Sequence, residues 1–176
     1  MIYLNMANER LEETKIFGLT MNFEKVTLYA MYSLAVLVPL IVGKPQILVG
    51  TFINFLIVYS TLTYGIKKSI PILILPSITA TSKGVLFGSA TYFLLYIMPF
   101  IMISNYLLSF FASKKKIALK VFAVFVKGIF LYVAYLIMNK TVGLPKVLMS
   151  SIPMQFLTAA LGFTFAFTLH RFAKEE

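Results

Sequence analysis

One lysine falls where a membrane-spanning helix would cross the middle of a bilayer. Lys127 lies in an apolar stretch at residues 118–138, nine positions from one end and eleven from the other. A midplane lysine costs at least about 2.5 kcal/mol on insertion scales, and such residues are functional by default. The ammonium must snorkel, lose its proton, meet backbone carbonyls, or pair with an anion from a ligand or a second subunit.

Polar and aromatic side chains occur at a similar depth in the neighbouring apolar stretches. Counting about 1.5 Å per residue places them in the outer halves of those stretches. We predict that they line a ligand-binding site together with Lys127; they are Asn54, Ser77, Tyr92, Tyr96, Tyr132 and Gln155. The alternative is interhelical hydrogen bonding combined with an interfacial tyrosine belt. Asn105 falls in an inner half, where a helix-packing role is expected.

The acidic, sulfur and imidazole side chains that catalysis and metal binding usually need are scarce. All six acidic residues lie near the ends, with none between Lys25 and Lys174, and the chain has one histidine and no cysteine. The chain therefore lacks the residues needed for metal clusters, thiol chemistry, catalytic triads and paired-carboxylate hydrolysis. Because Gly-rich phosphate loops are also absent, we expect no enzyme activity, no cofactor and no nucleotide binding.

The composition is that of an integral membrane protein. Hydrophobic residues make up 60% of the 176 residues, charged residues 12%, and the mean hydropathy is +0.89. The net charge of +10 is better explained by lysines flanking apolar spans in a lipid bilayer than by nucleic-acid binding.

Hydropathy predicts an all-α bundle of six transmembrane helices. A span needs about 20 residues to cross about 30 Å, and the six predicted spans are 26–43, 47–66, 69–83, 88–111, 118–138 and 147–170. The short third span contains Pro71 and Pro76, which predict a kink or a break. This membrane domain covers residues 25–171, with a tail at 172–176.

The positive residues predict the orientation. With the N-terminus inside, eleven Lys and Arg residues lie on the cytoplasmic side and four lie outside. This bias places both termini in the cytoplasm. The segment at residues 1–24 is then either an amphipathic helix on the cytoplasmic surface or an untethered tail.

Two further patterns predict helix contacts. Thr158, Gly162 and Ala166 repeat every four residues along the sixth span, which lets another helix approach closely. The inner halves of the first two spans are rich in Tyr, Ser and Thr. This polar patch indicates either a contact surface for another membrane protein or simple interfacial anchoring.

The middle of the chain resembles a known family. The segments GTFINFLIVYSTLTYGIKKSIPILILPSITA, GVLFG and MPFIMISNYLL are similar to a branch of the substrate-capture (S) components of energy-coupling-factor (ECF) importers. That branch carries a Pro-Ser-Ile segment in span three and a Pro-x-Ile-x-x-(Gly/Ser)-Asn segment in span four. The resemblance covers roughly residues 25–171.

The resemblance implies capture of a vitamin-like or other small micronutrient at the prokaryotic plasma membrane. It also implies a transmembrane coupling subunit with two ABC-type ATPases as partner. Many S components have an Ala-x-x-x-Ala docking pair in span one, whereas here Leu34 follows four residues after Ala30. Lys127 and the outer lysines favour an anionic ligand, and the alternative function is a structural or assembly subunit of a larger membrane complex without a ligand.

Overall fold

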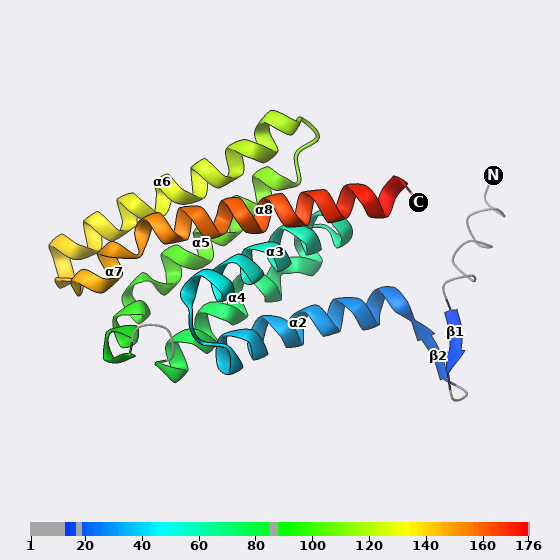
Figure 1. The fold of residues 1–176 in the computed structure, drawn as a ribbon, viewed down its shortest axis with the longest axis horizontal. Coiled ribbons are helices and arrows are strands. Elements are labelled where there is room, and N and C mark those ends of the chain that lie inside the picture. The colour runs from blue at the N-terminus through cyan, green and yellow to red at the C-terminus, as the bar shows by residue number, and fades with distance from the viewer. Residues whose placement is uncertain (1–12, 17–18, 85–87, 176) are drawn as a thin grey trace.

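A computed structural model describes residues 13–16, 19–84 and 88–175. Long helices run side by side along one axis (Figure 1). They are α2 (Phe23–Ile41), α3 (Gln46–Tyr64), α4 (Ile66–Lys83), α5 (Leu94–Ala112), α6 (Ile117–Val142) and α8 (Ile152–Glu175). The 3₁₀ helix η1 (Gly88–Phe93) precedes α5, and the short helix α7 (Lys146–Ser150) precedes α8. The all-α membrane domain predicted from hydropathy is therefore observed as a helical bundle.

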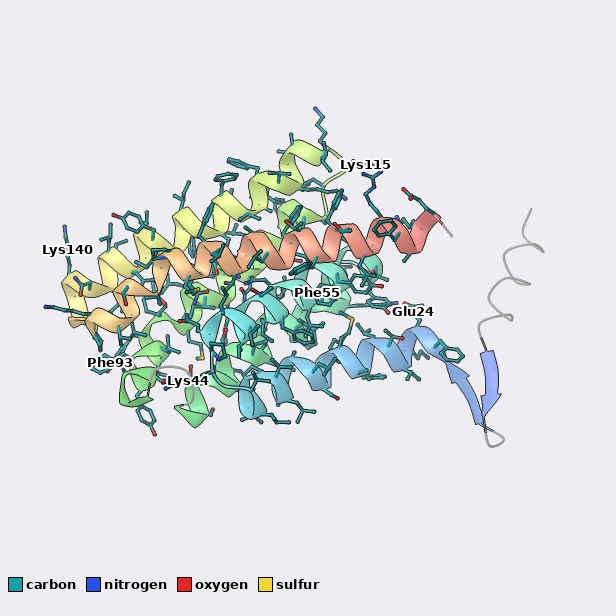
Figure 2. The ribbon with its side chains drawn as sticks, in the orientation of Figure 1. Glu24, Lys44, Phe55, Phe93, Lys115 and Lys140 are labelled. Atoms are coloured by element: carbon teal, nitrogen blue, oxygen red, sulfur yellow. The ribbon has the colours of Figure 1, made fainter. Side chains whose placement is uncertain are left out.

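The two ends of the bundle carry different connections. We call the end that holds residues 42–45, 88–93 and 143–151 the distal end, and the opposite end, where the C-terminus lies, the terminal end (Figure 1). In Figure 2, Lys44 and Lys140 lie toward the distal end, whereas Glu24 and Lys115 lie toward the terminal end.

Within the part of the chain that the structure describes, five helical segments are long and apolar enough to cross a membrane. They are Phe23–Ile41, Gln46–Tyr64, Ala90–Ala112, Ile117–Val142 and Lys146–Glu175. Large apolar side chains also remain exposed along these helices, among them Leu37, Phe125 and Phe165, as expected of surfaces that face lipid. The chain is thus a multi-pass membrane protein. Helix α4, the predicted third span, is not among the five.

Helix α4 is continuous despite its two prolines. It runs from Ile66 to Lys83 with Pro71 and Pro76 inside it, so the break that the prolines predicted is not present. The helix packs against α2, α3 and α5, and Ile72 and Leu73 are buried. Because neighbouring helices surround it, α4 tolerates the loss of two backbone donors.

The segment before α2 contains strands. Residues Glu13–Ile16 (β1) pair antiparallel with Leu19–Asn22 (β2). An amphipathic helix over residues 1–24 therefore does not extend through these two stretches. Residues 1–12 and 17–18 lie outside the described residues.

The closest helix pair is α3 with α8, and Gly162 is the reason. A Cβ atom at Gly162 would lie 2.6 Å from both Asn54 Cβ and the Thr51 carbonyl oxygen. Thr158 and Ala166, one turn to either side, are also buried. The predicted small-residue seam is confirmed, and its partner is α3 of the same chain.

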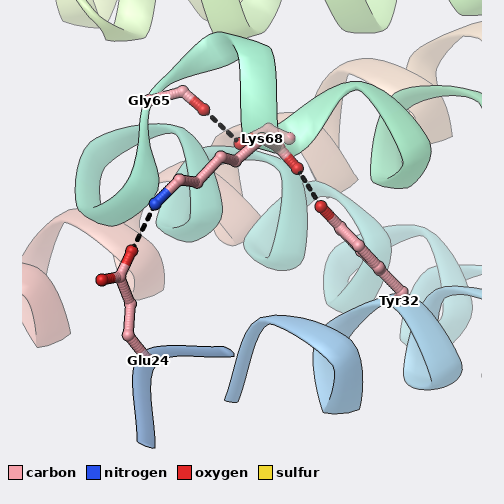
Figure 3. Close-up of polar contacts among 5 residues, drawn as sticks. Glu24, Tyr32, Gly65 and Lys68 are labelled. Atoms are coloured by element: carbon pink, nitrogen blue, oxygen red, sulfur yellow. Dashed lines mark hydrogen bonds and ion pairs between the residues drawn. The ribbon is translucent and has the colours of Figure 1, made fainter. Parts of the chain in front are cut away.

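Part of the polar patch predicted in the inner halves of the first two spans forms contacts between helices. Figure 3 shows Lys68 of α4 bonded to Glu24 (Nζ–Oε1 2.5 Å), while the Tyr32 hydroxyl donates to the Lys68 carbonyl oxygen (2.5 Å). Thr61 and Ser109 are buried and share a hydrogen bond of 2.7 Å between α3 and α5. These contacts join helices, while Tyr29 of the same patch is 64% exposed and remains on the surface.

Candidate functional site

Lys127 is buried at the centre of the bundle and is held by two amide side chains. Its side chain is 3% exposed. The ammonium donates to Asn54 Oδ1 (2.5 Å) and to Asn105 Oδ1 (2.6 Å). Of the outcomes expected from the sequence, neither snorkelling nor pairing with backbone carbonyls occurs, because side-chain amide oxygens take the two donors.

The orientation of both amides follows from their nitrogens. Asn54 Nδ2 donates to the Gly50 carbonyl oxygen (2.8 Å) and Asn105 Nδ2 donates to the Leu73 carbonyl oxygen (3.0 Å). With each NH₂ group bonded to a carbonyl, each oxygen must face Lys127. An ammonium has three donors and no acceptor, so these two oxygens leave one of its donors without a partner.

Local sequence explains why these groups meet. Lys127 lies four residues from Ala123 and from Leu131 on the buried stripe of α6, and this register turns it inward. The Leu73 carbonyl oxygen on α4 accepts a hydrogen bond from Asn105 Nδ2. Gly162 brings α3 close enough to α8 to position Asn54.

A cavity of about 90 Å³ adjoins this lysine. Residues from six helices line it, and they are Pro39, Gln46, Val49, Gly50, Ile53, Asn54, Pro76, Ser77, Ala80, Thr81, Leu94, Ile101, Asn105, Lys127, Gln155 and Thr158. Lys127 is the one charged residue among them. The mixture of apolar walls and a few convergent polar groups is typical of small-molecule sites.

Several polar groups in the cavity have spare bonding capacity. The side chains of Gln46, Ser77 and Gln155 make no hydrogen bond with any other described residue. Lys127 uses two of its three donors. The cavity thus presents an ammonium N–H, a hydroxyl and two amides to whatever enters it.

A second, open pocket of about 650 Å³ lies at the distal end. It is lined by Lys44, Pro45, Gln46, Val147, Ser150, Ser151 and Met154. Gln46 lines both spaces, and Met154 and Gln155 are adjacent on α8. The outer pocket therefore adjoins the inner cavity at Gln46.

Four of the seven residues predicted to bind a ligand are brought together in the cavity. They are Asn54, Ser77, Lys127 and Gln155. The other three, Tyr92, Tyr96 and Tyr132, are 65%, 50% and 50% exposed and do not line it. Tyr92 lies in η1 and Tyr96 in α5, so these two residues do not share one face of a single α-helix.

Asn105 packs helices, as expected, and it also belongs to the site. Its bond to the Leu73 carbonyl joins α5 to α4, and it contacts Lys127 and lines the cavity. Gln46 and Thr158 also line the cavity but were not predicted to do so. The small-residue seam of the sequence already indicated that Thr158 faces another helix. No sequence pattern indicated that Gln46 lines a cavity, because Gln46 lies at the edge of a predicted span.

Within the described residues, no three His, Cys, Asp or Glu side chains gather as a metal site would require. The site can bind and orient a molecule through hydrogen bonds and one positive charge. Comparison with protein-family models, curated proteins and solved structures finds no match for this chain.

Proposed function

We propose that this protein is the membrane-embedded substrate-binding subunit of an ECF-type importer in a prokaryotic plasma membrane. It captures a small molecule from outside the cell and performs no bond-making chemistry. The observation that carries the proposal is the central cavity, where the buried Lys127 and unbonded polar side chains face a space of about 90 Å³.

The position of the cavity supports capture from one side. Its neighbouring outer pocket lies at the distal end, which the distribution of positive residues predicts to be the non-cytoplasmic side. For the predicted topology of six spans with both termini inside, α4 must cross the membrane beside its neighbours. Its packing against three helices supports this assignment.

The partner follows from the resemblance of the sequence to S components. A coupling subunit driven by two ABC-type ATPases would supply the energy, since this chain has no phosphate-binding loop of its own. The Ala-x-x-x-Ala docking pair is missing, so the coupling subunit would contact a different surface of α2.

The test is to purify the protein without added ligand, denature it and identify the released molecules by mass spectrometry. We expect one small molecule in a near-stoichiometric amount, and less of it from Gln155→Leu, which removes an unbonded amide from the cavity. Lys140→Gln, at an exposed site at the distal end, is the matched control. The absence of any such molecule from the wild type would contradict the proposal.

A second function is favoured by one observation. Asn54 and Asn105 of the same chain accept two of the hydrogen bonds that Lys127 can donate. In a structural or assembly subunit, this network would serve only to hold helices together. That function predicts an empty cavity and co-purification with membrane proteins other than ATPases. The mass-spectrometry experiment separates the two.

A further inference from the structure

The charge in the cavity has no counterion among the described residues. No acidic residue lines the cavity, and the two described salt bridges join Lys68 to Glu24 and Arg171 to Glu175. Lys127 contacts only neutral amide oxygens. A buried charge is normally paired with an opposite one, and a ligand bound in this cavity would supply the negative charge.

We propose, building on the proposed function, that the ligand carries a single carboxylate that binds the third N–H of Lys127 in this cavity. One ammonium balances one negative charge. Phosphate groups, which carry up to two charges, are typically bound by Arg forks or helix N-termini. Among the residues lining this cavity there is no arginine and no second cation.

The remaining polar groups suit the same headgroup. A carboxylate has two oxygens and can accept about four hydrogen bonds. Lys127 supplies one donor, and the unbonded Ser77 hydroxyl and Gln155 amide supply others from α4 and α8. The headgroup thus has donors from three helices.

The volume limits what accompanies the carboxylate. A benzene molecule occupies a cavity of about 150 Å³ in an engineered protein, and this cavity measures about 90 Å³. It holds a carboxylate with only a few further carbon atoms. A larger ligand must extend past Gln46 into the outer pocket of about 650 Å³.

The experiment measures binding of matched carboxylates and amides to the intact protein in lipid nanodiscs. Acetate is compared with acetamide, and propionate with propionamide, by calorimetry, with inorganic phosphate as a further probe. We expect the carboxylates to bind about 30-fold or more tightly than their amides, the scale expected for losing one partner of a buried charge pair.

Two variants separate a ligand role from a structural one. Lys127→Gln keeps a donor for the asparagine oxygens but loses the charge, so the preference for carboxylates should disappear. Asn105→Asp puts a carboxylate within reach of the ammonium, and this built-in counterion should also abolish the preference in a folded protein. Lys140→Gln should retain it.

Four results would overturn the inference. They are equal binding of amides and carboxylates, tighter binding of phosphate, no binding of any probe, and a preference that survives in both variants. The proposed function is judged separately. A neutral molecule released from the purified protein would support ligand capture while refuting the carboxylate.

Discussion

At the scale of single residues, the most unusual feature is a buried lysine solvated by amides. Burying an ion costs several kcal/mol, and hydrogen bonds must offset that cost. Asn54 and Asn105 supply two acceptors from α3 and α5. Each asparagine is fixed in turn by a backbone carbonyl, so the three side chains form one connected unit.

Replacing Asn105 by Leu should destabilise the protein by about 2 kcal/mol. The change removes a charge-assisted hydrogen bond and leaves the Leu73 carbonyl without its side-chain donor. The free energy of unfolding in mixed detergent micelles measures the effect. Asn139→Leu, on an exposed part of α6, should change it by less than about 0.5 kcal/mol. Equal effects of the two changes would show that Asn105 adds nothing to stability.

The buried pair Thr61 and Ser109 provides a second test at this scale. Their hydroxyl oxygens lie 2.7 Å apart, and interhelical hydrogen bonds in membrane proteins average about 0.6 kcal/mol in double-mutant cycles. A cycle of Thr61→Val and Ser109→Ala should give a coupling energy of that size. Additive effects of the two substitutions would contradict the contact.

At the scale of elements, the seam between α3 and α8 places Asn54. Gly162 has no side chain, so the backbone of α3 lies against α8 at Thr51 and Phe55. Close approach at small residues is the main route to tight packing in membranes, where lipid tails are as apolar as leucine. The seam therefore serves both packing and the geometry of the site.

Gly162→Ala should weaken both stability and ligand retention. Its Cβ would come within 2.6 Å of backbone and Cβ atoms of α3, and overpacking of this kind costs about 1–3 kcal/mol. Unfolding in mixed micelles and the amount of co-purified ligand are the two measurements. Ala173→Val adds two methyl groups at an exposed site of the same helix and should leave both unchanged. Full stability of Gly162→Ala would show that α3 can move away freely.

At the scale of the whole molecule, the membrane side on which each loop lies determines from which side a ligand can enter the site. The cavity adjoins the pocket at the distal end, so capture from outside requires that end to face outward. Whether α4 crosses the membrane matters as well. Its absence as a span would reverse the orientation of every later helix.

Single cysteines can test this topology because the chain has none of its own. In intact cells, an impermeant maleimide should label Lys44→Cys, Tyr92→Cys and Lys140→Cys, all at the distal end. It should reach Lys67→Cys and Lys115→Cys only after the membrane is permeabilised. If α4 does not cross, Tyr92→Cys and Lys140→Cys would be protected and Lys115→Cys labelled. The parent protein without cysteine is the control.

The sequence by itself determined the helical membrane class and the approximate limits of the long helices. These properties depend on local hydropathy, which each stretch carries independently of its neighbours. The seam at Gly162 and the importance of Lys127 were also readable, since small-residue spacing and an intramembrane charge are features of one helix. The two prolines of α4 predicted a kink or a break but could not decide between them, because the outcome depends on the packing of α4 against α2, α3 and α5.

Only the tertiary structure decided which side chains share the site. Depth along a helix can be counted from the sequence, but the direction in which a residue faces depends on which helices lie beside it. Tyr92, Tyr96 and Tyr132 have a suitable depth and are exposed, whereas Asn105 was assigned to packing and contacts the lysine. The physical reason is that the ammonium must find acceptors in a nonpolar interior, and these come from two other helices, α3 and α5.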